Sequence, residues 1–256
     1  MAIDPNINKT IQQKLDEIEK KENVKILHCV ESGSRSWGFA SPDSDYDVRF
    51  IYARDMDFYL SLRPKKDYID WELNETLDIN GWDISKALLL FHRSNATVFE
   101  WSNSPVVYRT SDIWEKVRAV SNDYFSVKSC MYHYYGTATS NYNQYLTEEF
   151  VKYKKYFYVL RPLLCCKWIE KYKTAPPVLF DELKNTVLPK KLLSDIEALV
   201  AKKVEMSESD KGERVDVIND FIAGELAYYK NLLENMQDDR NKNWDKIDEI
   251  FKKIIL

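Results

Sequence analysis

Apolar runs and helix-period patterns alternate along the first hundred residues. The segment 4–22 places apolar side chains at helical spacing among Lys, Gln and Glu, which predicts an amphipathic helix packed against a sheet. Apolar runs at 24–30 and 48–52 predict two strands. Partial alternation predicts two more at 67–73 and 75–81, the last closed by a glycine turn. This order of elements predicts a small mixed sheet with flanking helices.

The second half of the chain has a different pattern. A helix over 82–93 and a second beginning at 95 complete the first half, and from residue 111 onward helical periodicity predominates. The helical segments expected there are 112–120, 124–135, 143–166, 190–204, 210–234 and 244–254. We therefore expect an α+β protein with an N-terminal α/β domain over 1–108 and a helical domain over 109–256.

Composition narrows the class of protein. The chain has 256 residues, 45% hydrophobic and 30% charged, which is ordinary for a globular protein with a sizeable core. Its net charge of −4 provides no overall basic field for long tracts of nucleic acid, although a local basic groove is compatible with it. The four cysteines form no disulfide framework or zinc motif. Because neither a signal-peptide core nor a membrane-length apolar run is present, we expect a cytoplasmic protein without membrane contact.

The stretch 31–50 joins two predicted strands through a glycine turn and an alternating pair of aspartates. Gly33 permits a sharp turn, and the backbone N–H groups around Gly33 and Ser34 suit a phosphate. On a strand, Asp45 and Asp47 would point the same way, roughly 7 Å apart. Two carboxylates that close repel each other unless a cation lies between them, and Mg²⁺ prefers such oxygen ligands. The stretch therefore predicts a site for nucleotidyl transfer.

The same residues carry a family resemblance. The string 32–47, SGSRSWGFASPDSDYD, resembles the DNA polymerase β-like nucleotidyltransferase superfamily, in which GS is followed by D-x-D on the next strand. It is similar to the YcgL-type branch of predicted nucleotidyltransferases, which includes the polymerase β-like proteins associated with RNA ligases. The segments 77–101 and 153–164 also resemble this branch. The resemblance implies a nucleotidyltransferase domain over 1–108 and a helical nucleotide- and acceptor-binding domain over 109–256.

The superfamily also implies a third carboxylate from a neighbouring strand, and two candidates exist. Asp78 lies within apolar alternation and matches the family's strand-to-helix junction. Asp83 stands at the start of a predicted helix, where an aspartate commonly caps free backbone N–H groups. We favour Asp78, so the predicted catalytic and metal-binding set is Asp45, Asp47 and Asp78.

Phosphate contacts are expected from both halves of the chain. Gly33 and Ser34 would hold the β- and γ-phosphates, with Arg35 as a further partner. In the helical half, many Tyr lie among Lys, either as a core edge with a solvated lysine face or as a base-stacking surface. The helix 153–164 resembles the family's corresponding helix, and from it Lys155 and Arg161 are the expected phosphate ligands.

These residues together predict an enzyme that moves NMP from an NTP to a hydroxyl acceptor and releases pyrophosphate. ATP is the first candidate for the NTP, and two Mg²⁺ ions, or Mn²⁺, would be the cofactors. The RNA-ligase-associated branch implies RNA as the acceptor, in tRNA or RNA end repair. The alternatives are nucleotidylation of a protein or small molecule, as in AMPylation, and nucleotide binding without turnover. The intact GS and D-x-D motifs argue against the last.

Overall fold

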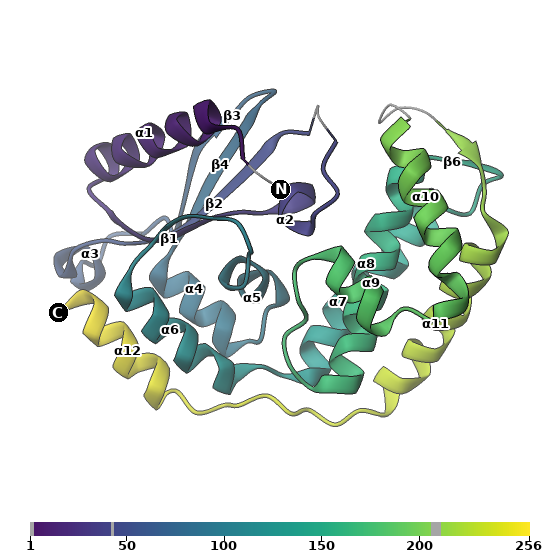
Figure 1. Ribbon diagram of the computed structural model, residues 1–256. Helices are drawn as coiled ribbons and strands as arrows, with labels where there is room; N and C mark the ends of the chain where they lie inside the picture. Colours follow the sequence, from purple (N-terminus) through teal and green to yellow (C-terminus); the bar gives the residue numbers. More distant parts are fainter. Residues whose placement is uncertain (1–2, 42–43, 206–210) are drawn as a thin grey trace. The chain divides into compact units, whose positions relative to one another are not determined.

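The computed structural model describes residues 3–41, 44–205 and 211–256, and Figure 1 shows their helices and strands. The chain forms two compact units, unit 1 of residues 1–125 with 240–256 and unit 2 of residues 126–239. Unit 1 contains α1 (Pro5–Glu22), β1 (Lys25–Glu31), α2 (Gly33–Trp37), β2 (Tyr46–Ala53), α3 (Met56–Leu60), β3 (Tyr68–Leu73), β4 (Leu77–Asp83), α4 (Ile84–His92), α5 (Ala96–Ser102), β5 (Val107–Thr110), α6 (Asp112–Ser121), the 3₁₀ turn η1 (Asn122–Tyr124) and α12 (Asp245–Ile255). Unit 2 contains α7 (Val127–Tyr145), β6 (Phe150–Val151), α8 (Tyr153–Tyr172), α9 (Phe180–Val187), the 3₁₀ turn η2 (Lys190–Leu192), α10 (Leu193–Glu205), β7 (Gly212–Glu213) and α11 (Asp216–Asn235).

A mixed sheet organises unit 1 and confirms the predicted fold class, α+β. Within the described ranges, its five strands run in the order β3-β4-β2-β1-β5. β1 lies antiparallel to both β2 and β5, while β2 and β4 are parallel neighbours, and β3 forms the antiparallel edge beside β4. The parallel pair β2–β4 is the part of the sheet that carries the candidate site.

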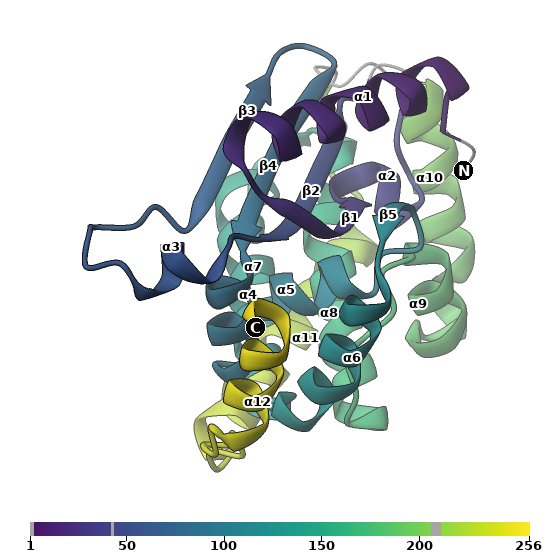
Figure 2. The same cartoon turned by 90° about the vertical axis from the view of Figure 1, so that its left-hand side faces the viewer.

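Helix α1 covers one face of this sheet, and α4, α5 and α6 lie on the other (Figures 1 and 2). The predicted amphipathic pattern is confirmed, because Ile11, Leu15 and Ile18 are fully buried against the sheet. Asp4 caps the helix by accepting from the Asn6 amide at 2.7 Å. A proline occupies the first helical position, where its fixed φ is already helical and its missing N–H costs no hydrogen bond. The helix therefore begins and ends within a residue of its predicted bounds.

The fourth predicted strand does not end in a glycine turn. β4 continues through Gly81 to Asp83, and a Cβ at Gly81 would lie 2.2 Å from the Phe50 ring. Gly81 is therefore a position of close packing inside the sheet, where a glycine makes room for a neighbouring side chain. The helix predicted from residue 82 accordingly begins at Ile84.

The single helix predicted over 143–166 is wrong, because the chain breaks between α7 and α8. The Leu146 carbonyl accepts from the Asn219 side chain at 2.8 Å, and residues 150–151 pair with β7 instead of continuing the helix. A contact of this kind, 73 residues away along the chain, is invisible to local periodicity. The helix predicted over 210–234 is α11, which begins at Asp216; position 210 itself lies outside the described residues.

The boundary expected at residue 108 differs from the division of the chain. β5 and α6 belong to unit 1, because β5 is the strand next to β1 and α6 packs against α4 and β1. The C-terminal segment also returns to unit 1, where Ile247 and Ile250 are buried and the Trp244 ring stacks on His92 with centroids 3.6 Å apart. In the described part of the chain, no helix combines the length and apolar character needed to cross a membrane.

Candidate active site

A glycine turn between β1 and α2 packs directly against Asp47. Gly33 has φ +59°, and a Cβ at this position would lie 2.0 Å from Asp47 Oδ2. The Ser32 amide also donates to the Asp47 carbonyl at 2.8 Å. Both the backbone conformation and the space therefore require glycine here, and the turn and the second aspartate of D-x-D form one local structure.

Asp47 and Asp78 are brought side by side by the strand register. They are register partners in the parallel pair β2–β4, and both side chains are partly exposed. Arg49, two residues further along β2, donates from Nη2 to Asp47 Oδ1 at 2.9 Å and to Asp78 Oδ2 at 2.7 Å. The two carboxylates thus share one face of the sheet and one cation.

Asp45 lies differently from the strand position expected for it. β2 begins at Tyr46, and Asp45 is an exposed residue just before the strand. Residues 42 and 43 of the resembling string lie outside the described residues. Among the residues that the structure describes, no three His, Cys, Asp or Glu side chains form a group that could hold a metal. Asp47 and Asp78 together provide the carboxylate oxygens that Mg²⁺ prefers. In the structure the Arg49 guanidinium is the cation that pairs with both carboxylates.

Glu31 contacts the candidate site and was not among the residues predicted from the motifs. It is fully buried at the end of β1, where Oε1 accepts from the Asp47 amide at 3.0 Å and Oε2 from the Tyr108 hydroxyl at 2.5 Å. Burial raises the pKa of the Glu31 carboxyl to about 7, although both donors oppose this shift. A glutamate at the end of an otherwise apolar strand was the available signal in the sequence.

Asp83 has the structural role that its position at a helix start predicts. It is buried, caps α4 by accepting from the Ser85 amide at 2.8 Å, and accepts from the Tyr59 hydroxyl at 3.1 Å. Burial raises the pKa of the Asp83 carboxyl, whereas the hydrogen bonds from Ser85 oppose the rise. Of the two candidates for the third carboxylate, only Asp78 is the register partner of Asp47.

Ser34 and Arg35 lie in α2, the one-turn helix that begins at Gly33. Ser34 is buried. The Arg35 guanidinium stacks over the Tyr46 ring at 3.8 Å, and its Nε donates to the Asp45 carbonyl at 3.0 Å. Arg35 therefore holds the chain that leads into D-x-D, and this contact occupies the group expected to bind phosphate.

Lys155 and Arg161, the other expected phosphate ligands, lie in α8 of unit 2. Lys155 Nζ stands over the rings of Tyr145 and Tyr158 at 4.0 and 5.0 Å, so it is surrounded by aromatic side chains. Arg161 is 2% exposed and donates from Nε to the Val178 carbonyl at 3.2 Å. Such burial argues against a direct contact between Arg161 and a phosphate.

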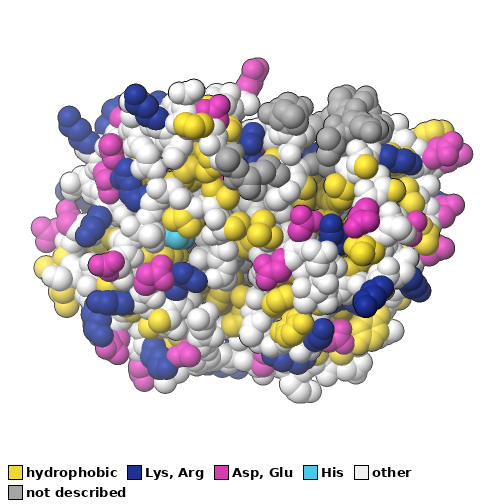
Figure 3. Space-filling view, viewed as in Figure 1, with side chains coloured by type: hydrophobic (Ala, Val, Ile, Leu, Met, Phe, Trp, Pro, Cys, Tyr) yellow, Lys and Arg dark blue, Asp and Glu magenta, His cyan; other side chains and the backbone are white. Residues whose placement is uncertain are grey.

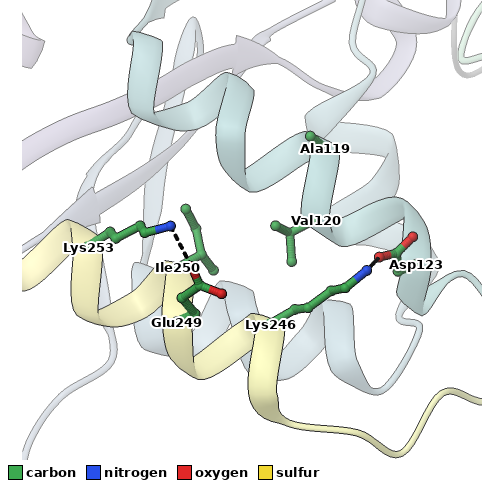
Figure 4. A pocket seen from close by; sticks show the side chains of 7 residues that line it. All are labelled: Ala119, Val120, Asp123, Lys246, Glu249, Ile250 and Lys253. Atoms are coloured by element: carbon green, nitrogen blue, oxygen red, sulfur yellow. Dashed lines mark hydrogen bonds and ion pairs between the residues drawn. The ribbon is translucent and has the colours of Figure 1, made fainter.

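A pocket of about 300 Å³ between α6 and α12 lies elsewhere in unit 1 (Figure 4). Its charged side chains neutralise each other, because Lys246 pairs with Asp123 and Lys253 with Glu249. Mixed charge is also what Figure 3 shows, where Lys and Arg are interspersed with Asp and Glu. Neither the pocket nor the face drawn there offers a continuous basic field.

Comparisons with known proteins identify the family of the chain. A family model described as the RNA repair pathway DNA polymerase beta family matches residues 7–253. A protein of Bacillus subtilis (strain 168), named uncharacterized protein YcgL, is 39% identical over 247 residues, which cover 96% of this chain and 94% of that protein. The crystal structure of a nucleotidyltransferase-like protein from Exiguobacterium sibiricum 255-15 has 11% sequence identity and a TM-score of 0.30, over 97% of this chain and 79% of its own. The expected resemblance is confirmed by the first two matches, and the chain belongs to the RNA repair pathway DNA polymerase beta family.

Proposed function

We propose that the protein is a metal-dependent nucleotidyltransferase that moves NMP from an NTP, ATP first among the candidates, to a hydroxyl group of RNA. The acceptor oxygen forms a bond to the α-phosphorus, the bond to the β-phosphate bridging oxygen breaks, and pyrophosphate leaves. The observation that carries the proposal is the pairing of Asp47 with Asp78 beside the Gly33 turn, in a chain of this family.

Asp47 and Asp78 would hold Mg²⁺, with Asp45 as a third ligand from the end of the preceding loop. Bound Mg²⁺ would neutralise charge on the triphosphate and favour ionisation of the acceptor hydroxyl. Arg49 keeps the two carboxylates side by side through its paired hydrogen bonds. The role of Glu31 is to hold the Asp47 backbone amide, and Gly33 leaves the room that the Asp47 carboxylate needs.

The backbone of the Gly33 turn and the Ser34 hydroxyl are the proposed contacts of the β- and γ-phosphates. Lys155 is retained as a phosphate ligand, whereas the burial of Arg161 favours a structural role. RNA is proposed as the acceptor because the family description associates its members with RNA repair.

The test supplies the purified protein with Mg²⁺, each α-³²P-labelled NTP in turn, and total cellular RNA and protein. We expect label in RNA, lost in Asp45→Asn and retained in Asp57→Asn, a matched change at another exposed aspartate. Label in a protein band would overturn RNA as the acceptor. Transfer by Asp45→Asn at the wild-type rate would remove Asp45 from the metal site.

A further inference from the structure

The loop between α3 and β3 gathers three cations, Arg63, Lys65 and Lys66. Arg63, Lys65 and Lys66 are exposed, and within the described residues none of them pairs with Asp or Glu. Other cations of unit 1 do have such partners, for example Arg54 with Glu22 at 3.2 Å. Figure 2 shows the loop extending away from the sheet beyond α3. The loop is therefore a local positive surface on a chain whose net charge is −4.

An exposed aromatic ring adjoins these cations. Tyr68, the first residue of the edge strand β3, is 37% exposed, and Lys66 Nζ lies 4.2 Å from its ring. Lys86 of α4 approaches the same ring at 5.1 Å and the Trp82 ring at 5.6 Å. Lys86 also pairs with Asp67 at 3.2 Å, which fixes its ammonium group above the rings. An accessible ring between cations is the arrangement that stacks a nucleobase and binds the adjoining phosphates.

This cluster lies on the same face of the sheet as the paired carboxylates. Tyr68 is the register partner of Trp82 across β3–β4, and Trp82 is four residues beyond Asp78 on β4. Because side chains alternate along a strand, Asp78 and Trp82 point to one face, with Cα atoms roughly 13 Å apart. A strand of nucleic acid lying over Tyr68 could thus have its end at Asp47 and Asp78.

We propose that Arg63, Lys65, Lys66, Tyr68 and Lys86, here called the β3-edge surface, bind single-stranded RNA and hold the acceptor strand. The assignment of the bound RNA as the acceptor rests on the proposed function, whereas the RNA binding itself does not require transfer. Single-stranded RNA fits better than a duplex because a base must unstack to cover the Tyr68 ring. The loop cations supply the phosphate contacts, and each contact releases counterions from the RNA.

The test is fluorescence anisotropy of the full-length protein with a labelled single-stranded RNA oligonucleotide over a range of salt concentrations. In the triple variant Arg63→Ala/Lys65→Ala/Lys66→Ala we expect binding at least tenfold weaker, with the slope of log K against log salt reduced by about 2. Tyr68→Ala should weaken binding by roughly tenfold, and Tyr68→Phe should retain it. The matched control is Lys9→Ala/Lys20→Ala/Lys252→Ala, which removes three exposed lysines elsewhere in unit 1 and should bind within about twofold of wild type.

The proposal would be overturned if the triple variant of Arg63, Lys65 and Lys66 and its lysine control lost the same RNA affinity. It would also be overturned if Tyr68→Ala bound RNA as tightly as the wild type. Preference for vesicles of anionic lipid or for an acidic peptide over RNA would also overturn it. The two proposals fail separately, because anisotropy without NTP measures RNA binding whether or not the wild-type protein transfers NMP. An RNA-binding protein without transfer would refute the proposed function alone.

Discussion

Glu31 holds the Asp47 amide with one carboxylate oxygen and the Tyr108 hydroxyl with the other. A glutamine at this position has only one acceptor oxygen, so one of the two donors must lose its partner. We expect Glu31→Gln to lower the NMP transfer rate at least tenfold, because the Asp47 backbone would shift. The KM for NTP should change little. Steady-state kinetics checks this, with Glu72→Gln on β3 as the matched control. Wild-type transfer by Glu31→Gln would show that Glu31 does not position Asp47.

His28 makes the stability of unit 1 depend on pH. It is buried and stacked on Trp114 with centroids 4.7 Å apart, and burial lowers its pKa to about 4. The folded state therefore binds fewer protons than the unfolded state, whose histidine pKa is about 6.5. The contribution of neutral His28 to the free energy of unfolding is fully present above pH 6.5 and is lost as the pH falls through about 4. The total loss is up to about 3 kcal/mol.

The measurement for His28 is urea unfolding at pH 7 and pH 4.5 for the wild type and for His28→Gln. The wild type should lose more free energy of unfolding than the variant between the two pH values. Equal losses would mean that the charge on His28 is not coupled to folding.

The sequence named some residues of the candidate site and not others. Gly33 and Asp47 were predicted from motif spacing, and Asp78 was favoured over Asp83 from apolar alternation and the family resemblance; the strand pairing then places Asp78 beside Asp47. Arg49 and Glu31 were not predicted, because their roles depend on which side chains the register brings together. Arg161 was assigned to phosphate because the helix 153–164 resembles the family's corresponding helix, and only packing shows that it is buried.

At the scale of elements, the junction of β4 and α4 separates a structural aspartate from the candidate catalytic one. Asp83→Ala should lower the free energy of unfolding by about 1–2 kcal/mol, because the α4 cap and the partner of the Tyr59 hydroxyl are both lost. Denaturant unfolding measures this change, and Asp83→Asn, which keeps an acceptor oxygen, is the control. Unchanged stability in Asp83→Ala would contradict the capping role.

Elements were predictable where the local pattern and the tertiary contacts agree. α1 and α6 follow from periodicity, and their bounds differ little from the prediction; the Asp4 side chain also caps α1. β5 and α9 were missed because each is short, with four and eight residues. The break at Leu146 required Asn219, which no local window contains.

The whole molecule is divided by its contacts and not by position along the sequence. Residues 240–256 are distant from the sheet in sequence, yet they complete unit 1. Ile250 of α12 is 4% exposed, and Ile250→Ala should lower stability by about 2–4 kcal/mol. Hydrogen exchange should show faster opening of α4 and α6 with little change in unit 2, and Ile254→Ala should have a smaller effect. Equal acceleration in both units would contradict this division.

We propose that Asp47 and Asp78 form one metal-dependent transfer site. The most direct measurement compares NMP transfer by Asp47→Asn, Asp78→Asn and Asp83→Asn, with thermal unfolding to confirm that each variant is folded. We expect the first two variants to lose transfer by about a thousandfold or more, while Asp83→Asn keeps most of it. Substantial transfer by folded Asp47→Asn or Asp78→Asn would show that the two carboxylates do not form the transfer site.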